Sequence, residues 1–136
     1  MILIDTQILV WATTGAVPVR PLHRKAMKRF ETLHRDGVLV SAISVWEVAL
    51  KAGRGSLIVN GSIEEWLSRV KRVSLLSLVP LTADVAVAAQ TMFGDWPHRD
   101  PADRFILATA VTLDVQLLTT DAGIRRYASQ HVIDID

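Results

Sequence analysis

The sequence predicts an α/β fold in which helices cover both faces of a central, mainly parallel sheet. Short runs of Val, Ile and Leu alternate along the chain with segments whose apolar residues recur at helical spacing. The expected strands are apolar throughout, which is typical of strands that are buried on both faces. The chain has 136 residues, the size of one domain, so we expect residues 1–136 to form a single domain.

Composition narrows the class of protein. Half of the residues are hydrophobic and 21% are charged, which excludes a disordered chain and leaves apolar surface for self-association or a partner. The absence of cysteine excludes disulfides and thiolate metal sites, and a cytoplasmic protein is the simplest expectation. The first residues carry no basic segment typical of a signal peptide, and no apolar run is long enough to span a bilayer.

The expected strands alternate along the chain with segments of one or two expected helices. Strands are predicted at residues 2–4, 38–40, 75–79, 115–118 and 132–133. Helices are predicted at residues 6–13, 22–35, 45–52, 63–73, 83–92 and 102–113, with a short helix at 122–127. The irregular segments are expected at 15–21, 53–61 and 94–101 because glycine and proline gather there.

Several residues predict where the helices begin and end. Ser44 and Ser62 each stand three residues before a glutamate, which is the spacing of a capping box. Gly53 is expected just after the end of the third helix. Asp100 followed by Pro101 predicts an N-cap with proline in the first helical position.

Four acidic residues occupy positions where a parallel sheet gathers its ligands. Asp5 and Asp121 directly follow predicted strands. Glu47 lies one helical turn after the second strand, and Asp103 opens a later helix. In an open α/β sheet the binding crevice lies outside the carboxyl ends of the strands. We therefore expect the four side chains to converge there.

Each acid also has an ordinary structural explanation. Asp5 and Asp121 suit helix N-caps, and Glu47 suits the third position of the box that Ser44 begins. Asp103 lies in a first helical turn, where the helix dipole favours negative charge. Capping does not explain the set as a whole, because four carboxylates in one crevice raise one another's pKa unless a cation lies among them.

The chemistry of the expected ligands indicates the cation. Carboxylate oxygens without thiolates suit Mg²⁺ or Mn²⁺ rather than zinc. One or two such ions activate water and stabilise the charge on a phosphodiester. The hydroxyls of Thr6 and of Thr119 or Thr120 stand beside the acids and are expected to orient them.

Four segments of the chain are similar to those of a known family. They are MILIDTQILVW at 1–11, SAISVWEVALK at 41–51, HRDPADRFILATA at 98–110 and LLTTD at 117–121. In this order they resemble PIN-domain proteins, and VapC-type toxins in particular, from Ile2 to Val132. The resemblance implies a three-layer α/β/α sandwich and a metal-dependent endoribonuclease. It also implies a homodimer and the toxin role of a type II toxin–antitoxin pair, with a small antitoxin as inhibitor.

The resemblance also assigns residues. It implies that Asp5, Glu47, Asp103 and Asp121 are catalytic. Of these, Asp5, Asp103 and Asp121 are the expected ligands of Mg²⁺ (or Mn²⁺), with Thr6 and Thr120 behind them. Gln7 departs from the histidine that is usual in close relatives and is expected to alter substrate contacts. Asp100 is interpreted as the N-cap, because the run after Asp103 matches the helix of the family.

Net charge is only +1, so RNA binding depends on where the basic residues lie. Lys51 and Arg54 follow Glu47 by four and seven residues on one helix face and are candidate substrate-binding residues. The helix region 20–35 is basic, which suits either RNA or a solvated face. We expect the four tryptophans to pack in the core or an interface, with Trp46 the candidate for base stacking. No role is assigned to the histidines, although His98 lies in a segment that could contact substrate.

Two alternatives remain open after other classes are excluded. A phosphatase of the haloacid dehalogenase type needs a second aspartate where Gln7 stands, and phosphate-binding glycine loops are absent. The first remaining alternative is a PIN-like nuclease that acts on DNA or in RNA processing without a toxin role. The second is a non-catalytic PIN-like binding module, which is expected to lack one or more of the four acids.

Overall fold

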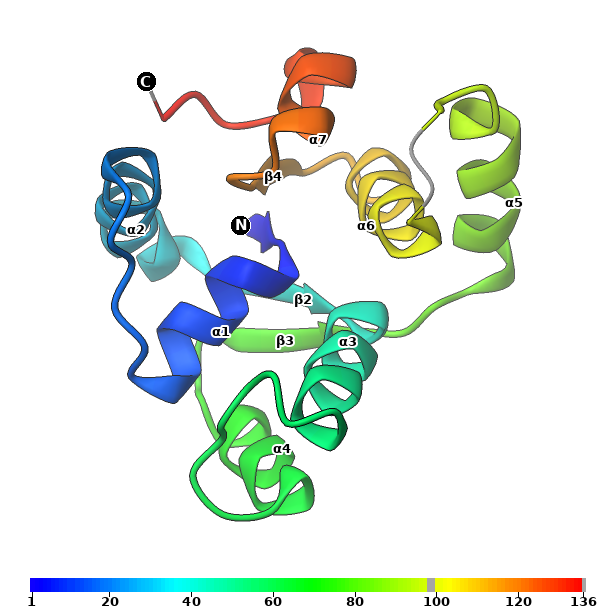
Figure 1. Cartoon of the computed structure of the whole chain (residues 1–136). Helices are drawn as coiled ribbons and strands as arrows, with labels where there is room; N and C mark the ends of the chain where they lie inside the picture. The colour runs from blue at the N-terminus through cyan, green and yellow to red at the C-terminus, as the bar shows by residue number, and fades with distance from the viewer. Residues whose placement is uncertain (98–99, 136) are drawn as a thin grey trace.

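The computed structural model describes residues 1–97 and 100–135, and a parallel sheet lies at its centre (Figure 1). The strands are β1 (Ile2–Ile4), β2 (Val38–Ser41), β3 (Leu76–Val79) and β4 (Gln116–Leu118), in the order β3-β2-β1-β4. Ile4, near the carboxyl end of β1, pairs with Val40 on one side and Leu118 on the other. The carboxyl ends of three strands therefore meet at one edge of the sheet.

The helices connect the strands as the sequence predicts. They are α1 (Thr6–Thr14), α2 (Pro21–Leu33), α3 (Ala42–Gly53), α4 (Ile63–Lys71), α5 (Ala83–Phe93), α6 (Pro101–Thr112) and α7 (Ala122–Tyr127). Short 3₁₀ turns follow α2 (η1, His34–Asp36) and α7 (η2, Ser129–His131). The expected fifth strand is reduced to a single parallel bridge between Leu117 and Val132.

The sheet has a separate hydrophobic core on each face, because successive strand residues point in opposite directions. Ile2 and Ile4 of β1 pack into a cluster with side chains of α1, α2 and α4. Leu3 packs into a second cluster with α5, α6 and α7. The predicted three-layer α/β/α arrangement is confirmed. No helix among the described residues has the length and apolar character needed to cross a bilayer.

The helix caps agree with the sequence at most positions and correct it at α3. Ser62 accepts the N–H of Glu65 at 3.1 Å, and Asp100 accepts the N–H of Ala102 at 3.0 Å. The cap of α3 is Ser41 rather than Ser44, and the helix includes Gly53 as its last residue. Ser44 therefore lies inside the helix, where it is buried.

The tryptophans divide into three groups. Trp66 and Trp96 are buried, and the indole N–H of Trp66 donates to the Thr13 hydroxyl at 3.0 Å. Trp11 is partly buried against the core. Trp46 is 55% exposed, so it does not pack in the core, and its packing in an interface stays a prediction.

Candidate active site

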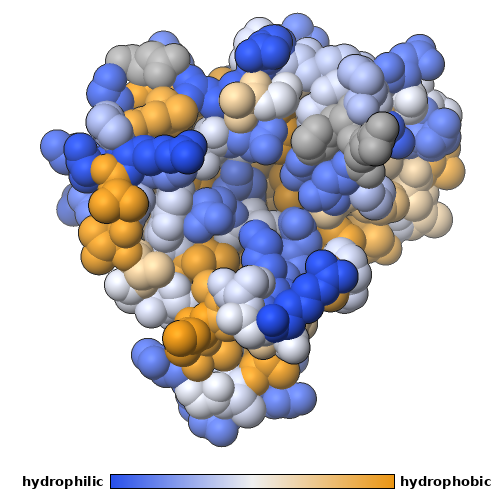
Figure 2. Space-filling view, viewed as in Figure 1, coloured by the Kyte–Doolittle hydropathy of each residue, from blue (hydrophilic) through white to orange (hydrophobic). Residues whose placement is uncertain are grey.

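A hollow of about 480 Å³ lies at the carboxyl edge of the sheet. Its lining includes all four of the acids singled out in the sequence, namely Asp5, Glu47, Asp103 and Asp121. Asp100 lines it as well. In Figure 2 the centre of the face seen in Figure 1 is hollowed, and hydrophilic residues lie in it. We call this hollow the acidic cleft.

Asp5 lies directly after β1 and caps α1. Its side chain is 6% exposed, and Oδ1 accepts the N–H of Ile8 at 2.9 Å. The other carboxylate oxygen accepts the hydroxyl of Thr119, and the backbone of Thr120 also donates to this carboxyl. Burial raises the pKa of Asp5 to about 6, against these hydrogen bonds and with a smaller contribution from the charge of Asp121. Asp5 is thus a carboxylate held in place at an energetic cost.

Thr119 connects two of the acids. It is fully buried, donates to Asp5 and accepts the N–H of Asp121 at 3.0 Å. Asp121 in turn caps α7, accepting the N–H of Ile124 at 2.8 Å. The expected orienting hydroxyl of Thr120 is therefore corrected to that of Thr119, while Thr120 contributes backbone and lines the cleft.

Glu47 points into the cleft from α3, and a hydroxyl from α1 holds it. Thr6 donates to Glu47, and its oxygen lies 3.0 Å from the hydroxyl of Ser44. Burial raises the pKa of Glu47, which the Thr6 hydrogen bond opposes; the charge of Asp100 raises it and that of Lys51 lowers it. The expected orienting role of Thr6 agrees with this contact.

Helix N-termini partly offset the crowding of the carboxylates. Asp5 caps α1, Asp100 caps α6 and Asp121 caps α7, so each of these helices begins at the cleft. Asp103 lies in the first turn of α6. The N-terminal end of a helix carries partial positive charge, so it stabilises a negative group beside it. The capping and cleft-lining interpretations of these acids therefore hold together.

The cleft also contains basic and polar side chains that its acidic interpretation did not include. Arg20 and His23, at the start of α2, line it together with Gln7 and the expected Lys51. Burial, and then the charge of Arg20, lowers the pKa of His23. Sequence reasoning placed Arg20 only within a basic helix region and gave His23 no role, because only the packing of α2 brings them to the sheet edge. Their signal was the basic start of this helix.

Of the candidate substrate contacts, Arg54 does not line the cleft. Arg54 follows the end of α3 and is exposed outside the lining residues, so its expected place beside Glu47 is wrong. His98 lies outside the described residues.

The lining residues match a hard divalent cation in the chemistry of their donors. The acids supply oxygen ligands, and the raised pKa of Asp5 marks a buried carboxylate that lacks a compensating charge. Among residues 1–97 and 100–135, no three acidic or histidine side chains already surround one point closely enough to hold an ion. The donor set fits a cation, whereas a closed coordination shell is not formed.

Known proteins are similar to this chain in sequence over most of its length. The model of the PIN domain family matches residues 2–130. Ribonuclease VapC22 of Mycobacterium tuberculosis is 32% identical over 127 residues, which cover 93% of this chain and 91% of that protein.

Solved structures agree in fold. A toxin–antitoxin complex from Klebsiella pneumoniae contains a chain with a TM-score of 0.70 and 18% identity, over 100% of this chain and 98% of that one. VapC20 of Mycobacterium tuberculosis, a toxin that cleaves the sarcin–ricin loop, has a TM-score of 0.68 and 16% identity, over 94% and 95%. FitAcB from Neisseria gonorrhoeae has a TM-score of 0.65 and 24% identity, over 99% and 98%.

Proposed function

The chain belongs to the PIN domain family, and from this premise we propose that it is a metal-dependent endoribonuclease that acts as the toxin of a toxin–antitoxin pair. The observation that carries the proposal is the gathering of Asp5, Glu47, Asp103 and Asp121 around one cleft. A relative that matches over 93% of the chain is a VapC ribonuclease. A non-catalytic module has no need of four carboxylates around one cleft, where like charges repel one another. We treat the chain as a single PIN domain.

We assign the four acids as catalytic, with Asp5, Asp103 and Asp121 as the ligands of Mg²⁺ or Mn²⁺. A bound ion of this kind would activate water and neutralise phosphate charge. The chain's own part is to position the ligands. Thr119 and the start of α1 fix both oxygens of Asp5. Such support matters, because loss of a hydrogen bond behind a ligand commonly costs 10–100-fold in activity or metal affinity.

Glu47 is the acid we place beside the reacting groups rather than on the ion. Thr6 orients its carboxylate, and Lys51 stands four residues further along the same helix face. Lys51 lines the cleft and therefore remains the candidate contact to a substrate phosphate. We do not extend that role to Arg54.

Cleavage of a single-stranded RNA tests the activity. The purified protein should cut it in Mg²⁺ or Mn²⁺, and EDTA should stop the cut. In-line attack by water should leave a 5′-phosphate and a 3′-hydroxyl. Single-stranded DNA of the same sequence tests the alternative substrate. An Asp103→Asn protein that is as active as wild type, or activity that survives EDTA, would refute the assignment.

An antitoxin is the partner we propose. A groove of about 440 Å³ lies between α3 and the segment before α4, lined by Ala49, Leu57 and Ile58 among others. Ile58 is 83% exposed, and the exposed Trp46 lies three residues before Ala49 on α3. An apolar groove of this kind suits an amphipathic or extended segment. A basic side chain from the same partner would neutralise the acids of the cleft.

We further propose that the protein forms a homodimer in the cytoplasm. Large apolar side chains of α5 are exposed, including Val87 at 61% and Met92 at 49%, and a two-fold interface would bury such a surface.

The toxin role has its own experiment. Wild type, expressed alone from an inducible promoter, should arrest growth and translation, and the Asp5→Asn variant should not. A co-expressed cognate antitoxin should restore growth. If soluble wild-type protein leaves growth unchanged without an antitoxin, the toxin role is refuted while the nuclease remains.

A further inference from the structure

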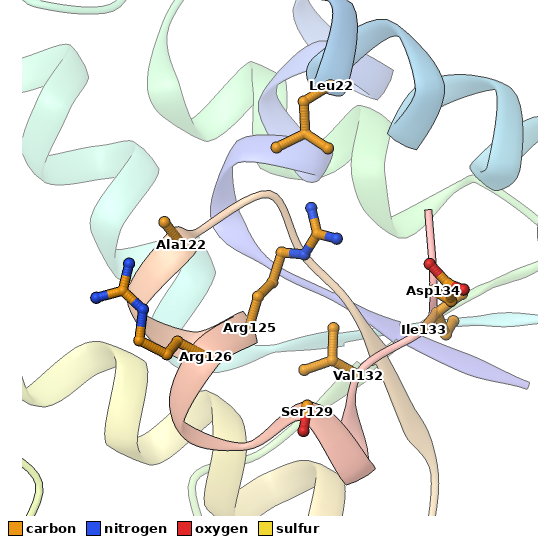
Figure 3. Close-up of a pocket in the computed structure, with 8 residues that line it drawn as sticks. All are labelled: Leu22, Ala122, Arg125, Arg126, Ser129, Val132, Ile133 and Asp134. Carbon is orange, nitrogen blue, oxygen red and sulfur yellow. The ribbon is translucent and has the colours of Figure 1, made fainter. Parts of the chain in front are cut away.

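A second hollow, of about 520 Å³, lies next to the acidic cleft (Figure 3). It is formed between α2 and the segment that follows β4. Ala122 lines both hollows. Leu22 lines the second hollow, and its neighbour in sequence, His23, lines the cleft. The two hollows therefore adjoin along the start of α7 and the start of α2.

The chemistry of the second hollow differs from that of the cleft. Arg125 and Arg126 supply two guanidinium groups, Ser129 supplies a hydroxyl and Asp134 supplies one carboxylate, so the lining is positive on balance. Leu22 and Val132 provide apolar walls. In Figure 3, Arg125 extends across the hollow toward Leu22, and Arg126 lies beside Ala122. Guanidinium groups bind phosphate through paired hydrogen bonds, and apolar walls accept a base. The lining thus suits a nucleotide.

Basic residues continue beyond this hollow. A third hollow, of about 460 Å³, is lined by Lys25, Lys28 and Arg29, and it shares Asp134 with the second. Lys25 and Arg29 lie three and seven residues after Leu22, so they stand on the same side of α2. Both lysines and Arg29 are exposed. A run of positive charge therefore follows α2 away from the acidic cleft.

This local charge is unusual for the protein. Residues 20–35 carry six of the fifteen lysines and arginines but one of the fourteen acids. The net charge of the whole chain is +1. An RNA backbone is repelled by the carboxylates of the cleft and is attracted only where cations gather.

We propose that a basic strip binds the RNA strand on one side of the scissile phosphate. The strip consists of Arg20, Lys25, Lys28, Arg29, Arg125 and Arg126. The strand leaves the acidic cleft past Ala122, places a nucleotide in the second hollow and follows α2 into the third. The inference rests on the proposed function, because it takes the substrate to be RNA.

The basic strip also explains how an enzyme with an acidic cleft attracts RNA at all. The attraction lies beside the reacting groups rather than among them. The bound strand then places its next phosphate over the cleft, where the carboxylates would hold an ion that supplies activated water.

Binding of a fluorescein-labelled single-stranded RNA, followed by anisotropy in EDTA over a series of salt concentrations, tests the proposal without cleavage. Two variants, Arg125→Gln/Arg126→Gln and Lys25→Gln/Lys28→Gln, each remove two charges. Each should weaken binding about tenfold near physiological salt and lower the slope of log affinity against log salt by about 1.4, which is about 0.7 for each lost charge on a single strand. An Arg125→Lys/Arg126→Lys variant should recover the salt slope.

Lys71→Gln/Arg72→Gln is the matched control. It removes the same charge from exposed residues at the end of α4 that line none of these hollows. It should bind RNA within about twofold of wild type. Circular dichroism would report whether replacement of the half-buried Arg125 disturbs the fold. In that case the Lys25→Gln/Lys28→Gln variant, whose two lysines are exposed, still tests the proposal.

The outcomes separate this proposal from the proposed function. If both strip variants bind RNA like wild type, or if the control weakens binding equally, the basic strip is refuted. The basic strip is also refuted as an RNA site if the variants keep RNA affinity and lose affinity for a polyglutamate peptide. The ligand of the strip is then an acidic protein segment. If wild type binds RNA through the strip but cuts none in Mg²⁺ or Mn²⁺, the nuclease function fails and the strip stands.

Discussion

Replacement of Asp5 by asparagine should abolish activity and at the same time stabilise the metal-free protein. Asparagine keeps the size of the side chain and serves equally well as an N-cap of α1. It accepts the N–H of Ile8 as aspartate does. What the variant loses is a negative charge that is 94% shielded from water, because only 6% of Asp5 is exposed.

The raised pKa of this carboxyl sets the magnitude. Burial raises it from 3.8 to about 6, which corresponds to about 3 kcal/mol of unfavourable free energy when the group is ionised in the folded state. The folded protein holds the proton more tightly than the unfolded chain does. The penalty is therefore absent below pH 4, grows between about pH 4 and pH 6, and is fully present above pH 6. The amide nitrogen of asparagine cannot accept the hydrogen bonds that the Thr119 hydroxyl and the Thr120 backbone donate. Allowing for that loss, we expect a gain of about 1 kcal/mol.

Urea unfolding of both proteins in EDTA, at pH 7.5 and at pH 4.5, measures this gain. The variant should be more stable at pH 7.5, and the difference should shrink at pH 4.5 because the wild-type carboxyl is then protonated. Added Mn²⁺ should stabilise wild type and not the variant, since the ion binds the folded carboxylate. A variant that is less stable at pH 7.5, or a difference that does not change with pH, would refute the reasoning.

Three further predictions concern other residues. Asp103→Asn should lower kcat/KM at least about 100-fold, whereas Asp100→Asn, which keeps the cap of α6, should lower it less than about tenfold in the RNA assay. Thr119→Val should lower kcat by about 10–100-fold by releasing Asp5, and Thr119→Ser should restore it. Trp66→Ala should cost about 3–5 kcal/mol in urea unfolding, because the indole is 1% exposed and donates a hydrogen bond to α1.

Each of these has an outcome that contradicts it. Equal losses from the two aspartate variants would make Asp100 as important as Asp103. A Thr119→Val protein with wild-type kcat would remove the positioning role of that hydroxyl. A Trp66→Ala protein that unfolds at the wild-type urea concentration would mean that the first core cluster does not depend on this side chain.

The sequence by itself determined the order and type of the elements, because both depend on neighbours along the chain. The runs at 2–4 and 38–40 are β-branched and apolar enough to form strands wherever they pack. The N-termini of α4 and α6 could be predicted because the caps Ser62 and Asp100 bond to backbone N–H groups only two or three residues away. The four acids could be proposed as a set, because all parallel strands end at the same edge. Each of these features depends on residues that are close in sequence, or on the common direction of the parallel strands.

The tertiary structure decided what depends on packing between distant segments. Whether Ser41 or Ser44 caps α3 depends on where β2 stops pairing with its neighbours. Thr119 rather than Thr120 reaches Asp5 because the side chains of adjacent residues leave the end of β4 in different directions.

The positions of the basic residues relative to the cleft also depend on packing between distant segments. The packing of α2 carries Arg20 and His23 into the cleft, whereas α3 ends with Arg54 outside it. Helical spacing predicts which residues share a face, but the neighbour of that face is chosen by burial of the opposite, apolar side. For α2 that side is anchored by Ala26 in the core, and this packing brings Arg20 to the acids of the cleft.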